Sequence, residues 1–388
     1  MSEPIYLDHA ATTPLAPGVA KAMYDALTDA PGNPSSQHRA GRRARARVDE
    51  AAAALAGLIG AQPRELVWTS GATESSNLAL RGVAGFVGEG ARIVSVVTEH
   101  PATRDTLAAL AKKGVTVDWL TVDEHGAIDL DDLAAALAEG PDLVSIMQVN
   151  NETGVIHDIP AIAEQCASAG VALHVDAAQS LGRLAIDVAT TPIALMSLSA
   201  HKMGGPKGIG ALYVRRRAPR VGLAAQIVGG GQQRGLRAGT LPTHQIAGFG
   251  AAARYAARGS LPAQAGWARL RERLWRAIEP AGGLIRNGRA ENTAAPFLSV
   301  SVAGLHGAAL IAGLGEGEPA LAVSAGAACS AAKGESSHVV RAMGRSPREA
   351  AATVRFSLGP GLDDAAVDVA AQRFVDEVAR LRALAAAA

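Results

Sequence analysis

Short runs rich in Val, Ile and Leu alternate along this chain with longer segments rich in Ala, Leu and Arg. The longer segments have the composition of helices, whereas the short runs are typical of strands that are buried on both faces. This alternation predicts an α/β fold with a mainly parallel sheet and helices on both faces. The predicted strands are 65–70, 92–100, 115–122, 142–150, 172–179, 195–202 and 210–216.

The ends of five predicted strands carry most of the chemically useful residues. Polar, small or ionisable residues stand there in TSGATESSN, TEHPATRD, VNNETG, VDAAQS and SAHKMGG. In open α/β sheets ligands bind at the carboxyl ends of the strands, so these clusters predict one shared polar site. Turns alone would not require the side chains found there, which include His100, Asp176, Gln179, His201 and Lys202.

Two of these residues, Lys202 and Asp176, suggest a particular cofactor. Lys202 stands at the end of a predicted strand and close to two glycines, a setting in which a desolvated amine can form a Schiff base. Asp176 also stands at a strand end and could hold a protonated pyridine nitrogen. Pyridoxal phosphate needs both a lysine imine and an acidic partner that keeps its ring an electron sink. Residues 71–73, at the predicted start of a helix, offer N–H groups and a hydroxyl for its phosphate.

Composition limits the classes of protein that fit. Lys and Arg number 37 and Asp and Glu 36, so the formal net charge of +1 provides no field that would attract nucleic acid or an anionic membrane. Two cysteines cannot form a disulfide framework, and they show no zinc-site spacing. The N-terminus, MSEPIYLDHAATTP, lacks the basic and apolar parts of a secretion signal. We therefore expect a cytoplasmic protein without a metal, a membrane span or a nucleic-acid partner. The arginine-rich stretch 39–50 is expected to be a solvated helix face or a subunit contact.

The two cysteines differ in their neighbours. Cys329 stands in VSAGAACSAAKG, among small residues that cannot bury it, so we predict a reactive thiol on a loop. Cys166 stands in IAEQCASAG at helical spacing and is predicted to be buried and inert.

Nearly the whole chain resembles the cysteine desulfurases of the NifS/IscS type, which are pyridoxal-phosphate enzymes of the aminotransferase class V family. The resemblance rests on YLDHAATTP, GNPSS, TSGATES, TEH, VNNETG, HVDAAQS, SAHKMGGPKGIGALYVRR, GGGQQRGLRAGT, the Cys329 stretch and VRFSLG. It implies the architecture of fold type I, with a seven-stranded sheet in a large cofactor-binding domain over residues 15–250. A small α+β domain over 1–14 and 251–388 would carry the cysteine loop, and the protein would be a homodimer.

The resemblance also implies a role for individual residues. Lys202 would bind the cofactor covalently, Asp176 would contact the pyridine nitrogen, and Cys329 would be the nucleophile that accepts sulfur. His100 would stack on the ring and is a candidate to carry protons. The other implied cofactor contacts are Ala72, Thr73, Ser199 and His201 at the phosphate, Gln179 at the phenolic oxygen, Asn151 beside the ring and Thr240 at the phosphate of the neighbouring subunit. The implied contacts of the substrate carboxylate are Asn33 and Arg355.

The implied reaction converts L-cysteine to L-alanine and leaves a persulfide on Cys329, for delivery to acceptor proteins in iron–sulfur cluster, thio-cofactor or tRNA biosynthesis. One alternative is a selenocysteine lyase. Another is a desulfurase dedicated to one pathway, such as nitrogenase maturation or DNA sulfur modification. A catalytically silent scaffold is disfavoured, because a scaffold would need neither Lys202 nor Cys329.

Overall fold

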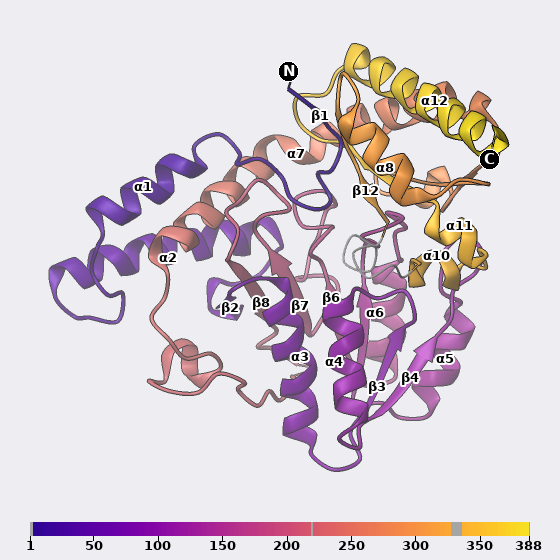
Figure 1. Ribbon diagram of the computed structural model, residues 1–388. Helices are drawn as coiled ribbons and strands as arrows, with labels where there is room; N and C mark the ends of the chain where they lie inside the picture. Colours follow the sequence, from indigo (N-terminus) through magenta and orange to yellow (C-terminus); the bar gives the residue numbers. More distant parts are fainter. Residues whose placement is uncertain (1–2, 219, 327–335, 388) are drawn as a thin grey trace.

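The computed structural model describes residues 3–218, 220–326 and 336–387, with side chains for all of these except residues 260–262. Its largest sheet has seven strands in the order β2-β8-β7-β6-β5-β3-β4 (Figure 1). Strand β8 pairs antiparallel with β2 and β7, and the other pairings are parallel. The predicted α/β class and mainly parallel sheet are therefore confirmed. The strands are β2 (Leu66–Thr69), β3 (Arg92–Val96), β4 (Thr116–Leu120), β5 (Leu143–Met147), β6 (Ala172–Asp176), β7 (Leu195–Ser199) and β8 (Gly210–Val214).

Each of these strands ends earlier than the sequence pattern predicts. The run 92–100, for example, leaves the sheet after Val96, and His100 caps the next helix instead. The run 195–202 likewise ends as a strand at Ser199, so Lys202 lies in the turn beyond it. The polar residues that follow each apolar run form hydrogen bonds with the backbone of turns and helix caps. The hydrogen bonds between strands therefore stop where these residues begin.

Helices cover both faces of this sheet. On one face α3 (Ala72–Val87) and α4 (Pro101–Ala111) bury Leu80 and Leu107 against the strands. On the other face the core is formed by α2 (Arg39–Leu58), α5 (Leu130–Ala138), α6 (Ile159–Ser168) and the first half of α7 (Thr243–Ile278). Cys166 lies in this core at 1% exposure, and burial raises its pKa to about 12, as expected of an inert cysteine.

A second, smaller body of structure packs at the end of α7. Its antiparallel sheet has the order β12-β13-β10-β9, and a separate parallel pair joins β1 to β11. Helices α8 and α12 and the second half of α7 cover the four-stranded sheet and share one hydrophobic core with it. The strands are β1 (Ile5–Tyr6), β9 (Leu284–Arg286), β10 (Phe297–Val302), β11 (Leu321–Ala322), β12 (Ser324–Ala325) and β13 (Thr353–Ser357). The helices are α8 (Gly307–Glu316), α10 (His338–Ala342), α11 (Pro347–Ala351) and α12 (Asp364–Ala387).

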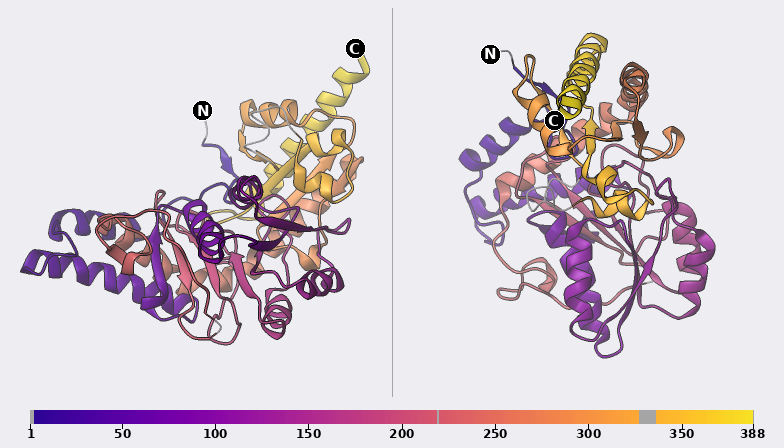
Figure 2. Two further views of the ribbon diagram at one scale, coloured as in Figure 1. Left: turned by 90° about the horizontal axis from the view of Figure 1, so that it is seen from below. Right: turned by 45° about the vertical axis from the view of Figure 1, so that its right-hand side comes forward.

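Helix α7 connects the two bodies and is 36 residues long. Ile246 and Phe249, near its start, belong to the core of the large sheet, whereas Leu270 and Leu274 belong to the core of the small one. The domain boundary expected between residues 250 and 251 falls inside this helix. Figure 2 shows α1 (Val19–Asp29) and α2 at one end of the molecule and the C-terminal helix α12 at the other.

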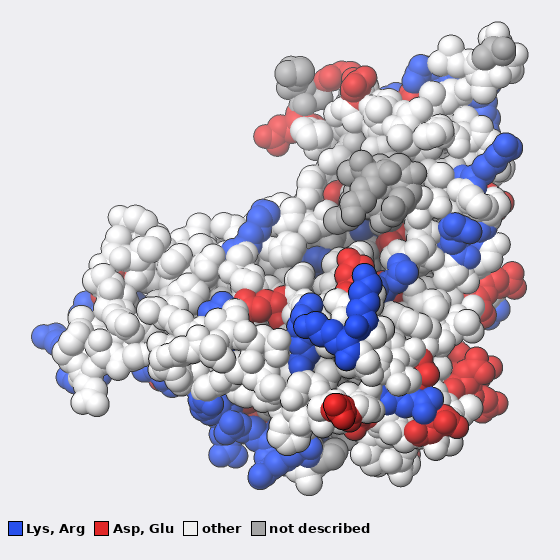
Figure 3. Space-filling view, turned by 60° about the horizontal axis from the view of Figure 1, so that its bottom comes forward, with Lys and Arg blue, Asp and Glu red and all other residues white. Residues whose placement is uncertain are grey.

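On the face shown in Figure 3, the side chains of Lys and Arg and those of Asp and Glu are both present, and neither sign covers the whole face. The arginines of stretch 39–50 lie on an exposed face of α2, as predicted, and two of them pair with acidic residues one turn away: Arg45 with Asp49 at 2.8 Å and Arg47 with Glu50 at 3.5 Å. Among the described helices, none combines the length and the apolar character that a bilayer crossing requires.

Candidate active site

A cavity of about 580 Å³ lies at the carboxyl ends of the parallel strands. The turns after β2, β3, β5, β6 and β7 all contribute to its wall, as the sequence predicts for one shared site. The residues expected in the site that line this cavity are Ala72, Thr73, His100, Asn151, Asp176, Gln179, Ser199, His201, Lys202 and Arg355.

Lys202 lies in the wall of the cavity, where its amine is a candidate nucleophile. Burial lowers its pKa to about 8; Asp176 opposes this, and the nearby cations Arg355 and Arg183 add to it. A lysine with this pKa is partly neutral at physiological pH, and only the neutral amine can attack a carbonyl carbon. The turn that carries Lys202 is held by the N-terminal segment, because Thr13 donates its backbone N–H and its hydroxyl to the His201 carbonyl at 2.9 and 3.0 Å.

Asp176 is the last residue of β6, in the middle of the sheet, and it is buried. One of its carboxylate oxygens accepts a hydrogen bond from the Ala178 N–H at 2.8 Å, which fixes the side chain at the strand end. Gln179 lies one turn further on and donates to the Ala10 carbonyl at 2.9 Å, while its own side-chain oxygen accepts from Arg183. A fixed, buried carboxylate at this place can hold one protonated nitrogen of a ligand.

His100 and His201 are both neutral imidazoles. Burial lowers the pKa of each to about 4, and the positive charge of Lys202 adds to the effect. His100 is the N-cap of α4, and its Nδ1 accepts from the Ala102 N–H at 3.0 Å, so its proton is on Nε2. His201 contacts the Thr12 hydroxyl through Nδ1 at 3.2 Å. Both of these contacts use Nδ1, and neither involves the Nε2 atom of its ring.

The start of α3 can bind an anion. Ala72 and Thr73 are its first residues, and the preceding Gly71 makes no side-chain cap, so first-turn N–H groups are left for a ligand. Ser199, buried at the end of β7, lies in the wall of the same cavity. Gly210 at the start of β8 is necessary here, because a Cβ would lie 2.5 Å from the Leu198 carbonyl oxygen and 2.6 Å from the Gly71 Cα.

Arg355 lies in the centre of β13 and is 4% exposed. Its Nη2 pairs with the Asp8 carboxylate at 2.7 Å, and its Nη1 donates to the Asn151 carbonyl at 2.7 Å. Its Nε and the Asn151 side-chain oxygen are buried without a partner among the described residues. Buried polar atoms are rarely left unpaired, so this donor and this acceptor are candidates for a hydrogen bond to a ligand or to an ordered water. Together with Lys202, Asp176 and the start of α3, this donor set fits pyridoxal phosphate and an amino-acid substrate.

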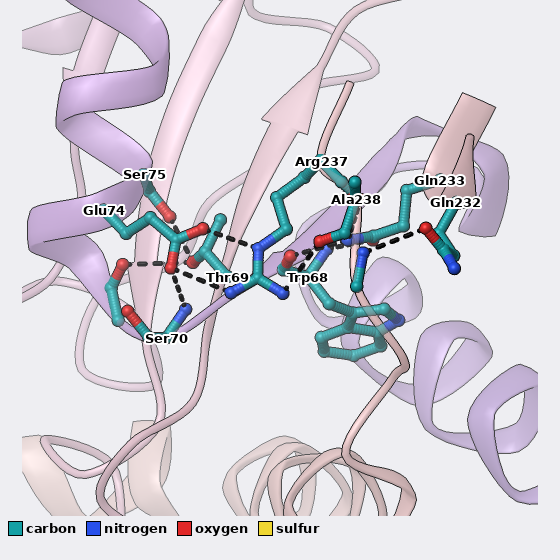
Figure 4. Close-up of polar contacts among 11 residues, drawn as sticks. Trp68, Thr69, Ser70, Glu74, Ser75, Gln232, Gln233, Arg237 and Ala238 are labelled. Atoms are coloured by element: carbon teal, nitrogen blue, oxygen red, sulfur yellow. Dashed lines mark hydrogen bonds and ion pairs between the residues drawn. The ribbon is translucent and has the colours of Figure 1, made fainter. Parts of the chain in front are cut away.

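Two of the expected site residues do not line the cavity, and a third lies outside the described residues. Asn33 lies in the exposed loop before α2, where its side-chain oxygen accepts from the Ser35 N–H at 2.9 Å. Thr240 is exposed and follows Arg237, which forms an ion pair with Glu74 (Figure 4). Cys329 lies outside the described residues. The described residues contain no group of three or more His, Cys, Asp or Glu that could hold a metal ion.

Two buried carboxyl groups at this site were not expected from the sequence. Glu99, directly before His100, accepts from the Met147 N–H at 2.5 Å, and burial and the charge of Asp176 raise its pKa well above the usual value. Glu152, directly after Asn151, accepts from the Ser337 hydroxyl at 2.5 Å, and a Cβ on Gly326 would lie 2.9 Å from the same oxygen. Both belong to the motifs TEH and VNNETG, but nothing in those letters indicates that the carboxyl groups point inward.

The fold and the site define a class of protein. The family model described as Aminotransferase class-V matches residues 5–369, so the chain belongs to this family, whose enzymes depend on pyridoxal phosphate. Within it, the chain is 46% identical to "Cysteine desulfurase IscS" from Serratia proteamaculans, over 99% of this chain and 95% of that protein.

Solved structures agree with this assignment. The chain superposes on a "NifS-like protein" with a TM-score of 0.90 and 31% identity, covering 97% of this chain and 100% of the other. It also superposes on "SspA in complex with cysteine" with a TM-score of 0.80 and 35% identity, covering 92% and 99% of the two chains.

Proposed function

We propose that this chain is a pyridoxal-phosphate-dependent cysteine desulfurase, which converts L-cysteine to L-alanine and transfers the sulfur to Cys329. The observation that carries the proposal is that Lys202, Asp176 and the uncapped start of α3 share one cavity. This arrangement occurs in a chain that is 46% identical to a cysteine desulfurase over almost its full length.

The cavity residues would hold the cofactor at its ends and at its ring. The N–H groups of Ala72 and Thr73, the Ser199 hydroxyl and His201 Nε2 would bind the phosphate. Asp176 would hold the pyridine nitrogen, Gln179 would face the phenolic oxygen, and His100 and Asn151 would lie against the ring. When bound, pyridoxal phosphate supplies an electron sink for charge that develops at the substrate Cα.

Proton transfer would be the work of Lys202 and His100. The Lys202 amine, with a pKa of about 8, is basic enough to take the Cα proton of cysteine and acidic enough to return it. His100 carries its proton on Nε2, because its Nδ1 accepts from the Ala102 N–H. A neutral imidazole uses this N–H as a hydrogen-bond donor, so proton transfer by His100 stays a prediction that follows from the resemblance.

Substrate recognition would rest on Arg355. Two of its nitrogens already bind Asp8 and Asn151, which fixes the guanidinium in the cavity wall, and its positive charge would attract the substrate carboxylate. Asn33 and Thr240 remain predictions, the first for the substrate and the second for the phosphate of the neighbouring subunit.

The sulfur step would break the Cβ–S bond of the substrate and form an S–S bond to Cys329. The substrate carbon is reduced to the methyl group of alanine and its sulfur is oxidised to the persulfide level, so no external oxidant or reductant is needed. Gly326 lines the cavity, and Cys329 follows it by three residues, a length of chain that spans at most about 11 Å.

The persulfide would be passed to an acceptor protein, such as an iron–sulfur scaffold or a sulfur-relay protein. A thiol nucleophile fits a reducing compartment, and the cytoplasm remains our prediction. The homodimer also remains a prediction, which the apolar residues exposed on α1 and around residue 228 favour.

Alanine release by the wild type and by Cys329→Ala tests this proposal, with L-cysteine and L-selenocysteine as substrates. We expect the variant to bind cofactor and L-cysteine but to release almost no alanine, because cleavage of the C–S bond needs the thiol. Wild-type protein treated with L-cysteine should carry one additional sulfur on the Cys329 peptide, removable by dithiothreitol, and none on the Cys166 peptide. Full activity of the variant with L-cysteine would refute the mechanism. If the variant releases alanine from L-selenocysteine but not from L-cysteine, the protein is a selenocysteine lyase.

A further inference from the structure

An acidic side chain stands in the wall of the anion site. Glu74 is in the first turn of α3, next to Ala72 and Thr73, and all three line the cavity. Its side chain is only 18% exposed. A carboxylate so close to a bound phosphate would repel it, and the repulsion is large where water is largely excluded. Phosphate binding at this site therefore requires a positive charge that neutralises Glu74.

Arg237 supplies that charge. Its Nε and Nη2 contact the two Glu74 carboxylate oxygens at 2.8 and 3.3 Å, and the Ser70 N–H donates to the same carboxylate at 2.8 Å (Figure 4). Burial raises the pKa of Glu74, but the hydrogen bonds from Arg237 and Ser70 outweigh this and lower the pKa below its usual value. Glu74 is therefore ionised, and Arg237 is the cation that pairs with it.

The segment that carries Arg237 is fixed on the edge of the large sheet. The Gln233 side chain accepts from the Trp68 N–H at 2.5 Å and donates to the Trp68 carbonyl at 2.8 Å, as a neighbouring strand would (Figure 4). Gln232 accepts from the Gly239 N–H at 2.9 Å, which closes the segment on itself. Gln233 and Arg234 both have left-handed backbone angles, with φ of 52° and 62°. Such angles are unfavourable for these residues, so the contacts must hold the segment in place.

From these contacts we infer that Arg237 is a positioning residue for the cofactor: by pairing with Glu74, it removes a like charge from the phosphate site at the start of α3. This inference rests on the proposed function only in that the anion is the cofactor's phosphate. Arg237 does not itself line the cavity. It acts through Glu74, and the pair should behave as one neutral unit toward the ligand.

Equilibrium binding of pyridoxal phosphate and of pyridoxal to the full-length apoprotein, followed by tryptophan fluorescence, separates this role from simple anchoring. We expect Arg237→Gln to weaken binding of pyridoxal phosphate by about ten-fold, because the carboxylate is then unpaired, and to leave pyridoxal binding within about two-fold. Glu74→Gln should bind pyridoxal phosphate at least as tightly as the wild type. The double variant Glu74→Gln/Arg237→Gln should return to within about two-fold of the wild type, because no unpaired charge is left.

Arg234→Gln is the matched control. Arg234 belongs to the same segment and donates to the Leu66 carbonyl at 3.3 Å, so its loss tests anchoring without removing the cation beside Glu74. We expect its affinity for pyridoxal phosphate to be unchanged. If the double variant binds as weakly as Arg237→Gln, or Arg234→Gln shows the same loss, the charge-pairing role is wrong. If the wild-type apoprotein binds neither ligand, the cofactor assignment fails as well.

Discussion

At the scale of single residues, the depressed basicity of Lys202 is the property with the clearest consequence. Its pKa of about 8 arises from burial, with Arg355 and Arg183 adding to the effect. An amine with a pKa of 8 is almost fully protonated at pH 6 and almost fully neutral at pH 10. The reactivity of the site toward an aldehyde should follow this titration.

We therefore expect the rate at which apoprotein takes up pyridoxal phosphate covalently to rise about five-fold between pH 7 and 8 and to level off above about pH 9. A lysine of ordinary pKa would still be gaining reactivity at pH 10. Stopped-flow absorbance measures the rate, and a model amine measured in parallel accounts for the titration of the cofactor itself. In Lys202→Ala, borohydride reduction should attach no cofactor to the chain; attachment there, or a rate that keeps rising at pH 10, would contradict the assignment.

The residues of the cavity differ in how well the sequence predicts them. Asp176 ends a strand, and His100 and Lys202 stand shortly after the ends of two others, so the polarity of a parallel sheet is enough to bring them together. Glu99 and Glu152 lie beside such residues, but their burial depends on packing by Met147 and by Ser337, which is distant in sequence. The pairing of Arg237 with Glu74, 163 positions apart, is of the same kind. Long-range side-chain contacts of this type have no signature in local sequence.

At the scale of elements, β8 lies between β2 and β7 and pairs with both. The existence of all these strands is predictable from their apolar runs, but the reversed direction of β8 is not, because the run 210–216 reads like the others. The short segment between β7 and β8 folds back on the end of β7, and Gly210 pairs with both Ser199 and Thr69. This glycine has backbone on both sides and no room for a side chain.

Gly210→Ala should lower the melting temperature of the apoprotein and weaken binding of pyridoxal phosphate, because the new methyl group would collide with main-chain atoms that cannot move separately. The cost is expected in the range of about 1–3 kcal/mol that overpacking usually causes. Gly259→Ala, on α7 with nothing within 4 Å of the added Cβ, is the control and should be neutral or slightly stabilising. Thermal unfolding of both variants measures the difference, and equal stabilities would show that the strands can separate at Gly210.

At the scale of the whole molecule, burial lowers the pKa of six histidines in the described part of the chain: that of His157, and those of five others, which fall to about 4, namely His9, His100, His174, His201 and His338. Their folded pKa lies below the unfolded value of about 6.5, so between these limits the unfolded chain binds more protons. The stability they provide is complete above pH 6.5 and is lost as the pH falls toward 4. Glu99 and Glu152, whose pKa is raised by burial, act in the opposite direction.

Urea unfolding of the apoprotein should therefore show a midpoint that falls steadily from about pH 7 to about pH 5. His338→Gln removes one of the buried imidazoles and should reduce the slope of this fall. His125→Gln replaces a histidine outside the buried set and should leave the slope unchanged. A midpoint that does not move over this range would mean that the buried imidazoles accept protons without unfolding.

The exposed apolar residues predict the quaternary structure. On the described surface, Leu27 on α1 is 56% exposed and Val228, just before the Gly-rich segment, is 81% exposed. If these residues form the subunit boundary, Val228→Asp should produce a folded monomer that loses pyridoxal phosphate, because Thr240 could no longer reach the neighbouring site. Leu384→Asp, at 56% exposure on α12, is the control and should remain dimeric. Sedimentation combined with cofactor absorbance measures both properties, and an active monomer loaded with cofactor would refute this arrangement.

The continuity of α7 ties the angular orientation of one body of the molecule to that of the other. A helix advances by about 100° per residue, so inserting a single residue between Phe249 and Leu270 would turn the second apolar stripe away from its core by that angle. Two residues would turn it by about 200°, whereas seven would restore the direction but lengthen the helix by about 10 Å. Natural variation in length should therefore be concentrated in the surface loops and be rare within this stretch of α7.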